Sequence, residues 1–195
     1  YNPLPKNDSV STTYEEGYVL FAGRLEREHK GLDYLIDVIK KISEEVPELR
    51  VTIIGDGPSH NWLNAEIEKA GLGEKVNLLG TTDNVYQFYE RASVMVQTSR
   101  WEGFGMTILE AMSCGIPVVA FHNYGPDEIV RDSVDGYLVD HFDTETFAKK
   151  VVEILKQPEQ RKQMGKCAIE RSRDFSLEKV LPLFKQYLEE ATKGL

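Results

Sequence analysis

Two carboxylates bracket a glycine-rich segment near the middle of the chain. Glu102 and Glu110 lie eight positions apart in the run EGFGMTILEAMSCGIP, and a helical pattern over residues 106–114 follows the glycines. Glycine allows close backbone approach and unusual φ angles, and a helix start offers unpaired N–H groups at the positive end of the helix dipole. Such a turn suits an anion, and a diphosphate fits it. Glu102 stays on the loop while Glu110 falls in the second helical turn, so we expect the two carboxylates to have different tasks.

The elements that would position these residues alternate between short apolar runs and longer amphipathic segments. This alternation is typical of a parallel sheet covered by helices. Strands are expected at residues 18–23, 50–55, 75–80, 93–98, 117–121 and 136–139, and helices at residues 32–46, 60–70, 84–92, 106–114 and, as a shorter turn, 126–131. The sequence therefore predicts an α/β fold with a Rossmann-like parallel sheet of about six strands flanked by helices.

The two ends of the chain differ from this pattern. After residue 143 the strand signals stop, and three helical patterns follow, broken near Pro158 and at residues 174–176. The last of them, over residues 177–188, is rich in Leu, Phe and Tyr, and we expect it to pack on this domain or on a part that the chain lacks. Residues 1–17 have the composition of a linker. We therefore expect one domain over residues 18–195, preceded by a linker.

Candidate ligand-binding residues follow four consecutive predicted strands. Gly23 and Arg24 come after the first, residues 55–58 after the second, 80–82 after the third and 99–105 after the fourth. Ligands of open parallel sheets bind outside the carboxyl ends of the strands. The glycines, small polar residues and charges at these ends therefore predict one ligand site along that edge.

The composition limits the class of protein. The chain has 195 residues, 41% of them hydrophobic, and a formal net charge of -9. That length supports one sizeable core, and the acidity argues against a nucleic-acid binder, which needs a basic surface. No apolar run approaches the ~20 residues of a membrane span. Cys114 and Cys167 have no metal-ligand spacing and are too few for a disulfide framework, so we expect a reducing, cytoplasmic setting.

Taken in order, the motifs resemble those of one enzyme family. The segments are GRLEREHKGLDYLI, IIGDGP, EGFGMTILEAMSCGIPVV, GPDEIVRDSVDGYLV and FSLEKV. They resemble the C-terminal, donor-binding half of retaining GT-B glycosyltransferases of the family 4 type, also called group 1, and the resemblance covers nearly the whole chain. It implies the C-terminal half of a GT-B fold, with a nucleoside diphosphate sugar as donor.

The resemblance also implies roles for individual residues. Arg24 and Lys30 match the cations that hold the donor diphosphate, and together with Glu102 they form the implied catalytic set. Two cations can stabilise the negative charge of a departing diphosphate. Glu110 matches the acid that accepts hydrogen bonds from the ribose hydroxyls, and Glu102 matches the acid beside the transferring sugar.

Further donor-binding positions follow from the same resemblance. Gly55 lies in the turn after the second strand, and Thr82 lies in a loop similar to the segment that reads the base. Backbone donors to the sugar and residues near the phosphates are implied at Gly103, Phe104, Gly105, Met106 and Thr107. The identity of the base stays open, chiefly between uridine and guanosine.

The implied reaction needs neither a metal nor a cofactor. In such enzymes the acceptor attacks on the face from which the leaving group departs, and a β-phosphate oxygen takes the acceptor proton, so Glu102 supports the sugar rather than acting as nucleophile or base. The chain contains no Asp-x-Asp motif. The acceptor, a glycan or glycolipid, is expected to bind mainly to an N-terminal domain that this chain lacks, and the full-length enzyme could associate peripherally with a membrane. Alone, the chain is expected to bind donor and transfer little.

Two other classes compete with this interpretation. A dinucleotide-dependent oxidoreductase would share the sheet, but Gly55 and Gly57 supply only the first two glycines of G-x-G-x-x-G, and the turn at Gly23 supplies one. A non-catalytic nucleotide-binding or interaction module is the alternative that the residues leave open.

Overall fold

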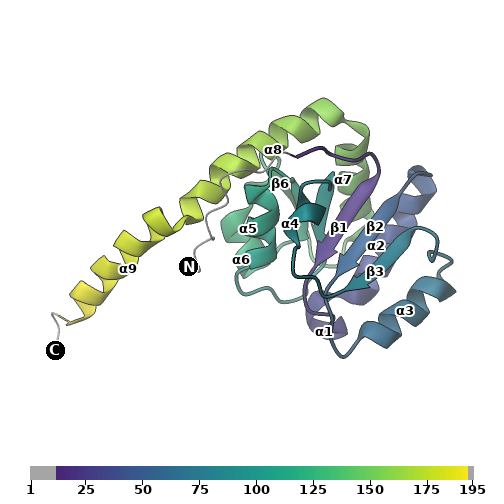
Figure 1. Ribbon diagram of the computed structural model, residues 1–195, viewed down its shortest axis with the longest axis horizontal. Helices are drawn as coiled ribbons and strands as arrows, with labels where there is room; N and C mark the ends of the chain where they lie inside the picture. Colours follow the sequence, from purple (N-terminus) through teal and green to yellow (C-terminus); the bar gives the residue numbers. More distant parts are fainter. Residues whose placement is uncertain (1–11, 193–195) are drawn as a thin grey trace.

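A six-stranded parallel β-sheet forms the centre of the computed structural model, which describes residues 12–192 (Figure 1). The strands are β1 Tyr18–Ala22, β2 Arg50–Ile54, β3 Val76–Gly80, β4 Val94–Gln97, β5 Val118–Phe121 and β6 Gly136–Val139. They lie in the order β3-β2-β1-β4-β5-β6. All six predicted strands and the Rossmann-like α/β fold are confirmed. Because the order reverses between β1 and β4, the sheet has a switch point at which ligands of this fold class bind.

Helices cover both faces of the sheet. One face packs against α2 Leu32–Glu45, α3 His60–Lys69 and α7 Thr144–Lys156; the other packs against α4 Tyr86–Tyr89, α5 Met106–Ser113, α6 Tyr124–Ile129 and α8 Pro158–Ser172. Successive side chains of a strand point to opposite faces. Val19 and Phe21 of β1 accordingly join the first core, and Leu20 joins the second. A strand buried on both faces reads as a continuous apolar run, as YVLFA does.

Three helix boundaries differ from the sequence prediction. A short helix α1, Arg27–Lys30, precedes α2 and is separated from it by Gly31, whose φ is 58°. A Cβ on Gly31 would lie 2.1 Å from the carbonyl oxygen of Thr98, so only glycine fits there. The helix expected at residues 84–92 spans only Tyr86–Tyr89, with hydrogen-bonded turns after it. Helix α6 begins at Tyr124, before Pro126, because proline is tolerated in a first helical turn.

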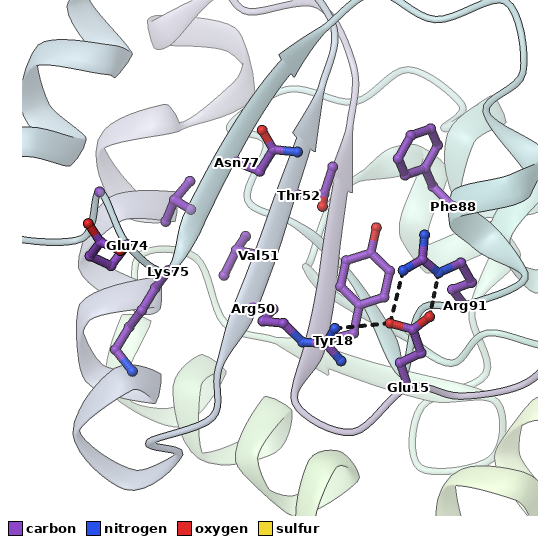
Figure 2. Close-up of a pocket in the computed structure, with 12 residues that line it drawn as sticks. Glu15, Tyr18, Arg50, Val51, Thr52, Glu74, Lys75, Asn77, Phe88 and Arg91 are labelled. Atoms are coloured by element: carbon purple, nitrogen blue, oxygen red, sulfur yellow. Dashed lines mark hydrogen bonds and ion pairs between the residues drawn. The ribbon is translucent and has the colours of Figure 1, made fainter.

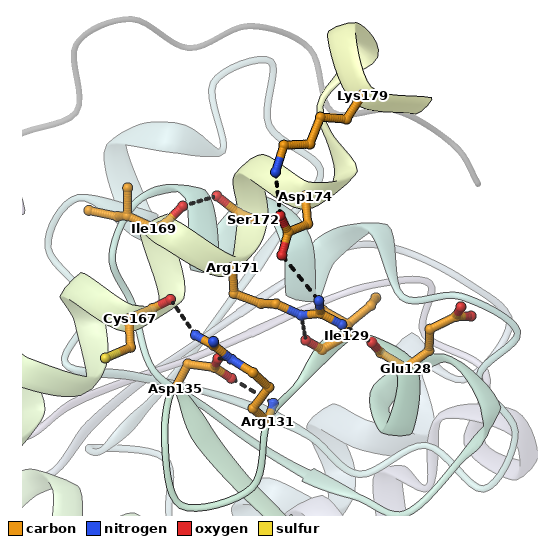
Figure 3. Close-up of polar contacts among 10 residues, drawn as sticks. All are labelled: Glu128, Ile129, Arg131, Asp135, Cys167, Ile169, Arg171, Ser172, Asp174 and Lys179. Atoms are coloured by element: carbon orange, nitrogen blue, oxygen red, sulfur yellow. Dashed lines mark hydrogen bonds and ion pairs between the residues drawn. The ribbon is translucent and has the colours of Figure 1, made fainter. Parts of the chain in front are cut away.

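Polar contacts hold α8 on the domain (Figure 3). The Arg131 guanidinium donates to Asp135 at 2.6 Å and to the carbonyl of Cys167 at 3.1 Å. Arg171 donates to the carbonyl of Ile129 at 3.0 Å. Asp135 is fully buried, and burial raises the pKa of its carboxyl although Arg131 acts in the opposite direction. These bonds tie α8 to the end of α6 and to the segment between α6 and β6.

The last helix, α9 Leu177–Thr192, projects away from the domain after the 3-10 turn η1 Arg173–Phe175 (Figure 1). Within the part of the helix whose side chains are described, Val180 is buried and the other apolar residues are largely exposed: Leu177, Leu181, Leu183, Phe184, Tyr187 and Leu188. The three predicted C-terminal helical patterns are thus confirmed. Packing on this domain, one of the two expectations for the last helix, is confined to its start.

The segment before β1 is partly described. Residues 1–11 of the predicted linker lie outside the described residues, and residues 12–17 are hydrogen-bonded to the domain. Thr13 N–H donates to Glu90 O at 2.8 Å, and the Tyr14 hydroxyl donates to Gly115 O at 2.7 Å. The domain boundary at residue 17 stays a prediction. Across residues 12–192, each helix is too short or too polar to cross a bilayer.

Candidate functional site

A pocket of about 360 Å³ lies at the carboxyl edge of the sheet, above the ends of β1 and β2. It brings together five of the sequence-predicted site residues: Arg24, Gly55, Thr82, Thr107 and Glu110. They come from the ends of three strands and from α5, as the strand-end argument predicts. The Arg24 side chain is 71% exposed, and its ion pair with Glu26 is long, at 3.8 Å, so its guanidinium can turn toward a ligand.

Close backbone contact shapes the floor of this pocket. Gly55 has a φ of 135°, and a Cβ there would lie 1.9 Å from the carbonyl oxygen of Gly23. The Gly55 N–H donates to Gly80 O at 2.8 Å, and the Gly23 N–H donates to Ile54 O at 3.0 Å. Hydrogen bonds therefore join the ends of β1, β2 and β3 where the pocket opens. Gly55 is needed for the backbone geometry whatever it contacts in a ligand.

Glu110 lies in the second turn of α5 and lines the pocket. Tyr89, which is fully buried, donates its hydroxyl to Glu110 Oε2 at 3.1 Å. Burial raises the pKa of the Glu110 carboxyl, and the Tyr89 hydrogen bond opposes that shift. The tyrosine fixes one carboxylate oxygen, and the other oxygen has no hydrogen bond among those described, so it can accept from a ligand hydroxyl. Tyr89 was not predicted as a site residue.

Glu102 is the centre of a second polar cluster, on the loop after β4. Lys30 Nζ lies 2.6 Å from Glu102 Oε2, and Gln97 Nε2 and Ser99 Oγ each lie 3.3 Å from the same oxygen. The Lys30 side chain also lies against Gly23, since a Cβ there would be 3.7 Å from Lys30 Cε. The structure therefore brings two predicted catalytic residues, Lys30 and Glu102, into direct contact beside the pocket.

The partners of Glu102 were not predicted from the sequence. Gln97 is the last residue of β4 and is 1% exposed. Its Oε1 atom is buried and lacks a hydrogen-bond partner within the described part of the chain. A polar residue ending an otherwise apolar strand, VMVQ, is the signal that could have identified it. Because the Gln97 amide is buried and donates to the Glu102 carboxylate, it restricts the orientation of that carboxylate.

Asn123, just after β5, forms hydrogen bonds to the loop after β4 that contains Glu102, which we call the Glu102 loop. Its Nδ2 donates to Ser99 O at 2.8 Å and to Arg100 O at 3.2 Å, and its Oδ1 accepts from Glu102 N at 3.2 Å. Arg100 binds Asp33 through two hydrogen bonds, at 2.9 and 2.6 Å. The loop is thus tied both to β5 and to α2. Asn123 was not among the residues predicted from the sequence.

The glycine-rich turn leads into α5 as predicted. Gly105 precedes the helix with a φ of 94°, and no side chain caps this helix start. The first-turn N–H groups at Met106 and Thr107 are therefore oriented outward without intrahelical acceptors. The Phe104 ring packs edge-on to Phe175 at 5.9 Å, so it belongs to the core rather than to the pocket. The backbone N–H groups of Gly103 and Phe104 stay predicted donors to a ligand.

A second cavity, of about 440 Å³, lies at the opposite edge of the sheet (Figure 2). Tyr18 and Arg50, the first residues of β1 and β2, line it. Figure 2 shows the Glu15 carboxylate between Arg50 and Arg91, with which it forms ion pairs. Glu15 offsets part of the positive charge of the two arginines, and none of the predicted site residues lies here. The pocket at the carboxyl edge remains the candidate site. Across residues 12–192, no group of three or more His, Cys, Asp or Glu side chains is placed to hold a metal ion.

The sequence model of the family described as "Glycosyl transferases group 1" matches residues 6–171. This match spans most of the chain, and the chain belongs to that family. The fold, too, is that of GT-B glycosyltransferases. The family expected from the resemblance of the motifs is thereby confirmed.

Individual relatives agree with this assignment. An uncharacterized glycosyltransferase of Methanocaldococcus jannaschii is 35% identical over 182 residues, which are 91% of this chain and 50% of that protein. A mutant of TarM from S. aureus, solved with Fondaparinux, alpha-GlcNAc-glycerol and UDP, superimposes with a TM-score of 0.85 at 28% identity, covering 92% of this chain and 38% of TarM. Anabaena HepE, solved with UDP, gives a TM-score of 0.78 at 25% identity, covering 92% and 49%. The chain spans about half, or less, of the length of these relatives.

Proposed function

We propose that this chain is the donor-binding domain of an enzyme that transfers a sugar from a nucleoside diphosphate sugar to a glycan or glycolipid acceptor. The observation that carries the proposal is the pocket at the switch point of the sheet, in which Arg24, Thr107 and Glu110 gather. The Lys30–Glu102 pair lies beside it. TarM and HepE were each solved with UDP, which favours a uridine nucleotide here as well.

The proposed donor lies along this edge with its diphosphate at the start of α5. Arg24 and Lys30 neutralise the charge that grows on the diphosphate as it leaves, and the N–H groups at Met106 and Thr107 add to this stabilisation. Glu110 accepts hydrogen bonds from the ribose hydroxyls through Oε1, the oxygen that Tyr89 does not contact. The base lies toward the loop that contains Thr82, and the sugar lies toward Glu102.

We assign retention of anomeric configuration to this transfer. The acceptor attacks from the face that the diphosphate leaves, and its proton passes to a β-phosphate oxygen. Glu102, which Lys30, Gln97 and Ser99 hold in place, orients the sugar and stabilises its developing positive charge. We propose that the two cations do this work without a divalent metal, so turnover of the intact enzyme should persist in EDTA.

The rest of the active site belongs to a part outside this chain. Because the chain spans about half of its relatives' length, we propose that a second domain binds most of the acceptor and that the isolated chain binds donor but transfers little. Neither Cys114, which is buried, nor Cys167 forms a disulfide, and free cysteines suit a cytoplasmic reaction on activated sugars. Docking of the intact enzyme on a membrane surface is compatible with a glycolipid acceptor.

Calorimetric titration of the chain with UDP, GDP and ADP tests the proposal. We expect UDP to bind, and Lys30→Ala and Glu110→Ala each to weaken binding about tenfold or more, equivalent to ~1.4 kcal/mol. Lys69→Ala, an exposed cation on α3 away from the pocket, is the matched control. Binding that neither site variant weakens would refute these roles. A nucleotide-binding chain whose intact parent transfers no sugar would instead support the non-catalytic alternative.

A further inference from the structure

A groove of about 750 Å³ opens on the same edge of the sheet, beyond the Glu102 loop. Its walls come from the segments after β4, β5 and β6 and from α6, and they include Arg100, Trp101, Asn123, Tyr124, Asp127 and His141. The groove and the nucleotide pocket have no lining residue in common. It is therefore a separate cavity, within the size range of small-molecule pockets.

The strand order fixes the position of the groove relative to the chemistry. The nucleotide pocket lies over the ends of β2 and β1 and the loop after β3, while the groove lies beyond β4, β5 and β6. Glu102 follows β4, between the two. A ligand that continues past Glu102, away from the nucleotide, enters the groove. That is the direction in which an acceptor, rather than the donor nucleotide, extends.

Two large aromatic side chains are exposed at the groove. Trp101 is 62% exposed and Tyr124 is 88% exposed. A sugar ring carries polarised C–H bonds on one face, and these are attracted to the electron-rich face of an aromatic ring. Two contacts with His29 fix the position of Trp101. The two rings pack edge to face with their centroids 5.6 Å apart, and the His29 carbonyl accepts from the Trp101 backbone N–H at 3.4 Å. The aromatic pair thus offers a platform for pyranose rings.

The charges of the groove, which Glu128 also lines, disfavour an anionic ligand. The guanidinium of Arg100 forms two hydrogen bonds to Asp33 and stacks on Tyr34 at 4.1 Å, so its charge is already neutralised. The Asp127 carboxylate accepts from Asn123 N at 3.1 Å through Oδ1, which also lies 2.9 Å from His122 Nδ1. Both described contacts use Oδ1, so Oδ2 can accept from a sugar hydroxyl.

We propose that this groove is a saccharide-binding subsite for the acceptor, taking a neutral glycan that stacks on Trp101 and Tyr124 and donates hydroxyls to Asp127. The acceptor role rests on the proposed glycosyl transfer, whereas saccharide binding by the groove does not. An acceptor would then be held partly by this domain, and its end would be presented to the donor sugar beside Glu102.

The first test is a titration of the chain with maltose, cellobiose and diacetylchitobiose, with glycerol 1-phosphate as the anionic comparison. Trp62→Phe serves as the background, so that the fluorescence comes from Trp101, the other of the two tryptophans. We expect at least one neutral disaccharide to bind with a Kd of about 1 mM, and Tyr124→Ala to weaken it about tenfold or more. Tyr187→Ala, which truncates a tyrosine 67% exposed on α9, is the matched control and should bind as the background does.

Three results would overturn the proposal: no disaccharide binds up to about 20 mM, only glycerol 1-phosphate binds, or Tyr124→Ala and Tyr187→Ala behave alike. A parallel UDP titration keeps the two proposals apart, because loss of UDP binding counts against the donor site and not against the groove. In the intact enzyme, Tyr124→Ala should raise the KM for acceptor. A raised KM for donor instead would contradict the acceptor role.

Discussion

Lys30 Nζ lies 2.6 Å from Glu102 Oε2, and the two side chains are only 19% and 13% exposed. The contact joins the segment after β1 to the loop after β4, which are neighbours in the sheet although 72 residues apart in sequence. An ion pair so shielded from water is stronger than one at the surface. In the absence of donor, the cation proposed for the diphosphate is therefore held by the carboxylate proposed for the sugar.

This pair predicts opposite effects of two substitutions on UDP binding. Lys30→Ala removes a phosphate-binding cation and should weaken UDP about tenfold or more. Glu102→Gln removes the carboxylate that competes with phosphate for Lys30, so UDP should bind as tightly as in the wild type or more tightly. Turnover of the intact enzyme should nevertheless fall about a hundredfold or more with Glu102→Gln, as when one charge-stabilising group is removed.

Calorimetry on the chain and turnover on the intact enzyme check this prediction. Circular dichroism verifies that both variants fold, since removing one partner of a shielded pair leaves the other uncompensated. If Glu102→Gln weakened UDP as much as Lys30→Ala does, the carboxylate would not be a competitor for the lysine.

Two glycines of the site predict different costs of substitution. Gly55→Ala would put a Cβ 1.9 Å from Gly23 O at a φ of 135°, so we expect a loss of about 3 kcal/mol or more, or failure to fold. Gly103→Ala meets nothing within 4 Å, and we expect the free energy of unfolding to stay within about 0.5 kcal/mol. Urea denaturation of both variants measures the difference. Equal costs would mean that the turn after β2 relaxes more than its packing indicates.

The sheet could be predicted because each strand leaves a mark in the sequence. Strands such as YVLFA and VVAF are buried on both faces and read as unbroken apolar runs. The short helices were less predictable. Helix α1 has only four residues, and a close backbone contact at Gly31 separates it from α2, so no periodic pattern marks it. The range of α4 was overestimated because hydrogen-bonded turns and helix share one amphipathic pattern.

Residues that are proposed to contact a ligand are marked in the sequence, whereas residues that hold other parts of the site in place are marked less clearly. Arg24, Gly55 and Glu110 follow strand ends or a helix start, and the fold brings them together in one pocket. Gln97 contacts Glu102 only five residues along the chain, and the polar end of its strand marks it. Asn123 joins the segment after β5 to the loop after β4, and nothing in its local sequence states those partners. Such contacts depend on tertiary structure, so residue type and spacing along the chain do not identify them.

The burial of Glu110 predicts that its ionised carboxylate lowers the stability of the fold while it serves nucleotide binding. Because burial raises the pKa of its carboxyl in the folded protein, the folded state holds that proton more tightly than the unfolded state. The free energy of unfolding therefore falls as pH rises from the ordinary to the raised pKa, and above that range the ionised carboxylate is a net cost. Glu110→Gln removes the cost while its amide oxygen can still accept from Tyr89. We expect a higher Tm at pH 7.5, by roughly 2–4 °C per kcal/mol, and weaker UDP binding.

Thermal unfolding between pH 4 and pH 8 checks this prediction. The gain in Tm should shrink toward pH 4, where Glu110 is protonated in the wild type too. Ser113→Ala, on the same helix, leaves Glu110 in place, so its Tm difference from the wild type should show no such pH trend. A Tm for Glu110→Gln below the wild type at pH 7.5 would show that the ionised carboxylate stabilises the fold.

The hydrogen bonds of Asn123 predict that its side-chain amide keeps the Glu102 loop ordered. Asn123→Ala removes hydrogen bonds to Ser99 O and Arg100 O and the acceptor for Glu102 N, which should cost about 1–3 kcal/mol. The backbone amide of Glu102 should then exchange with deuterium faster. Asn77→Ala, at an exposed position on β3, is the matched control and should leave that exchange unchanged. Unchanged protection in Asn123→Ala would mean that the other contacts of the loop, among them Arg100 with Asp33 and Glu102 with Lys30, are sufficient to order it.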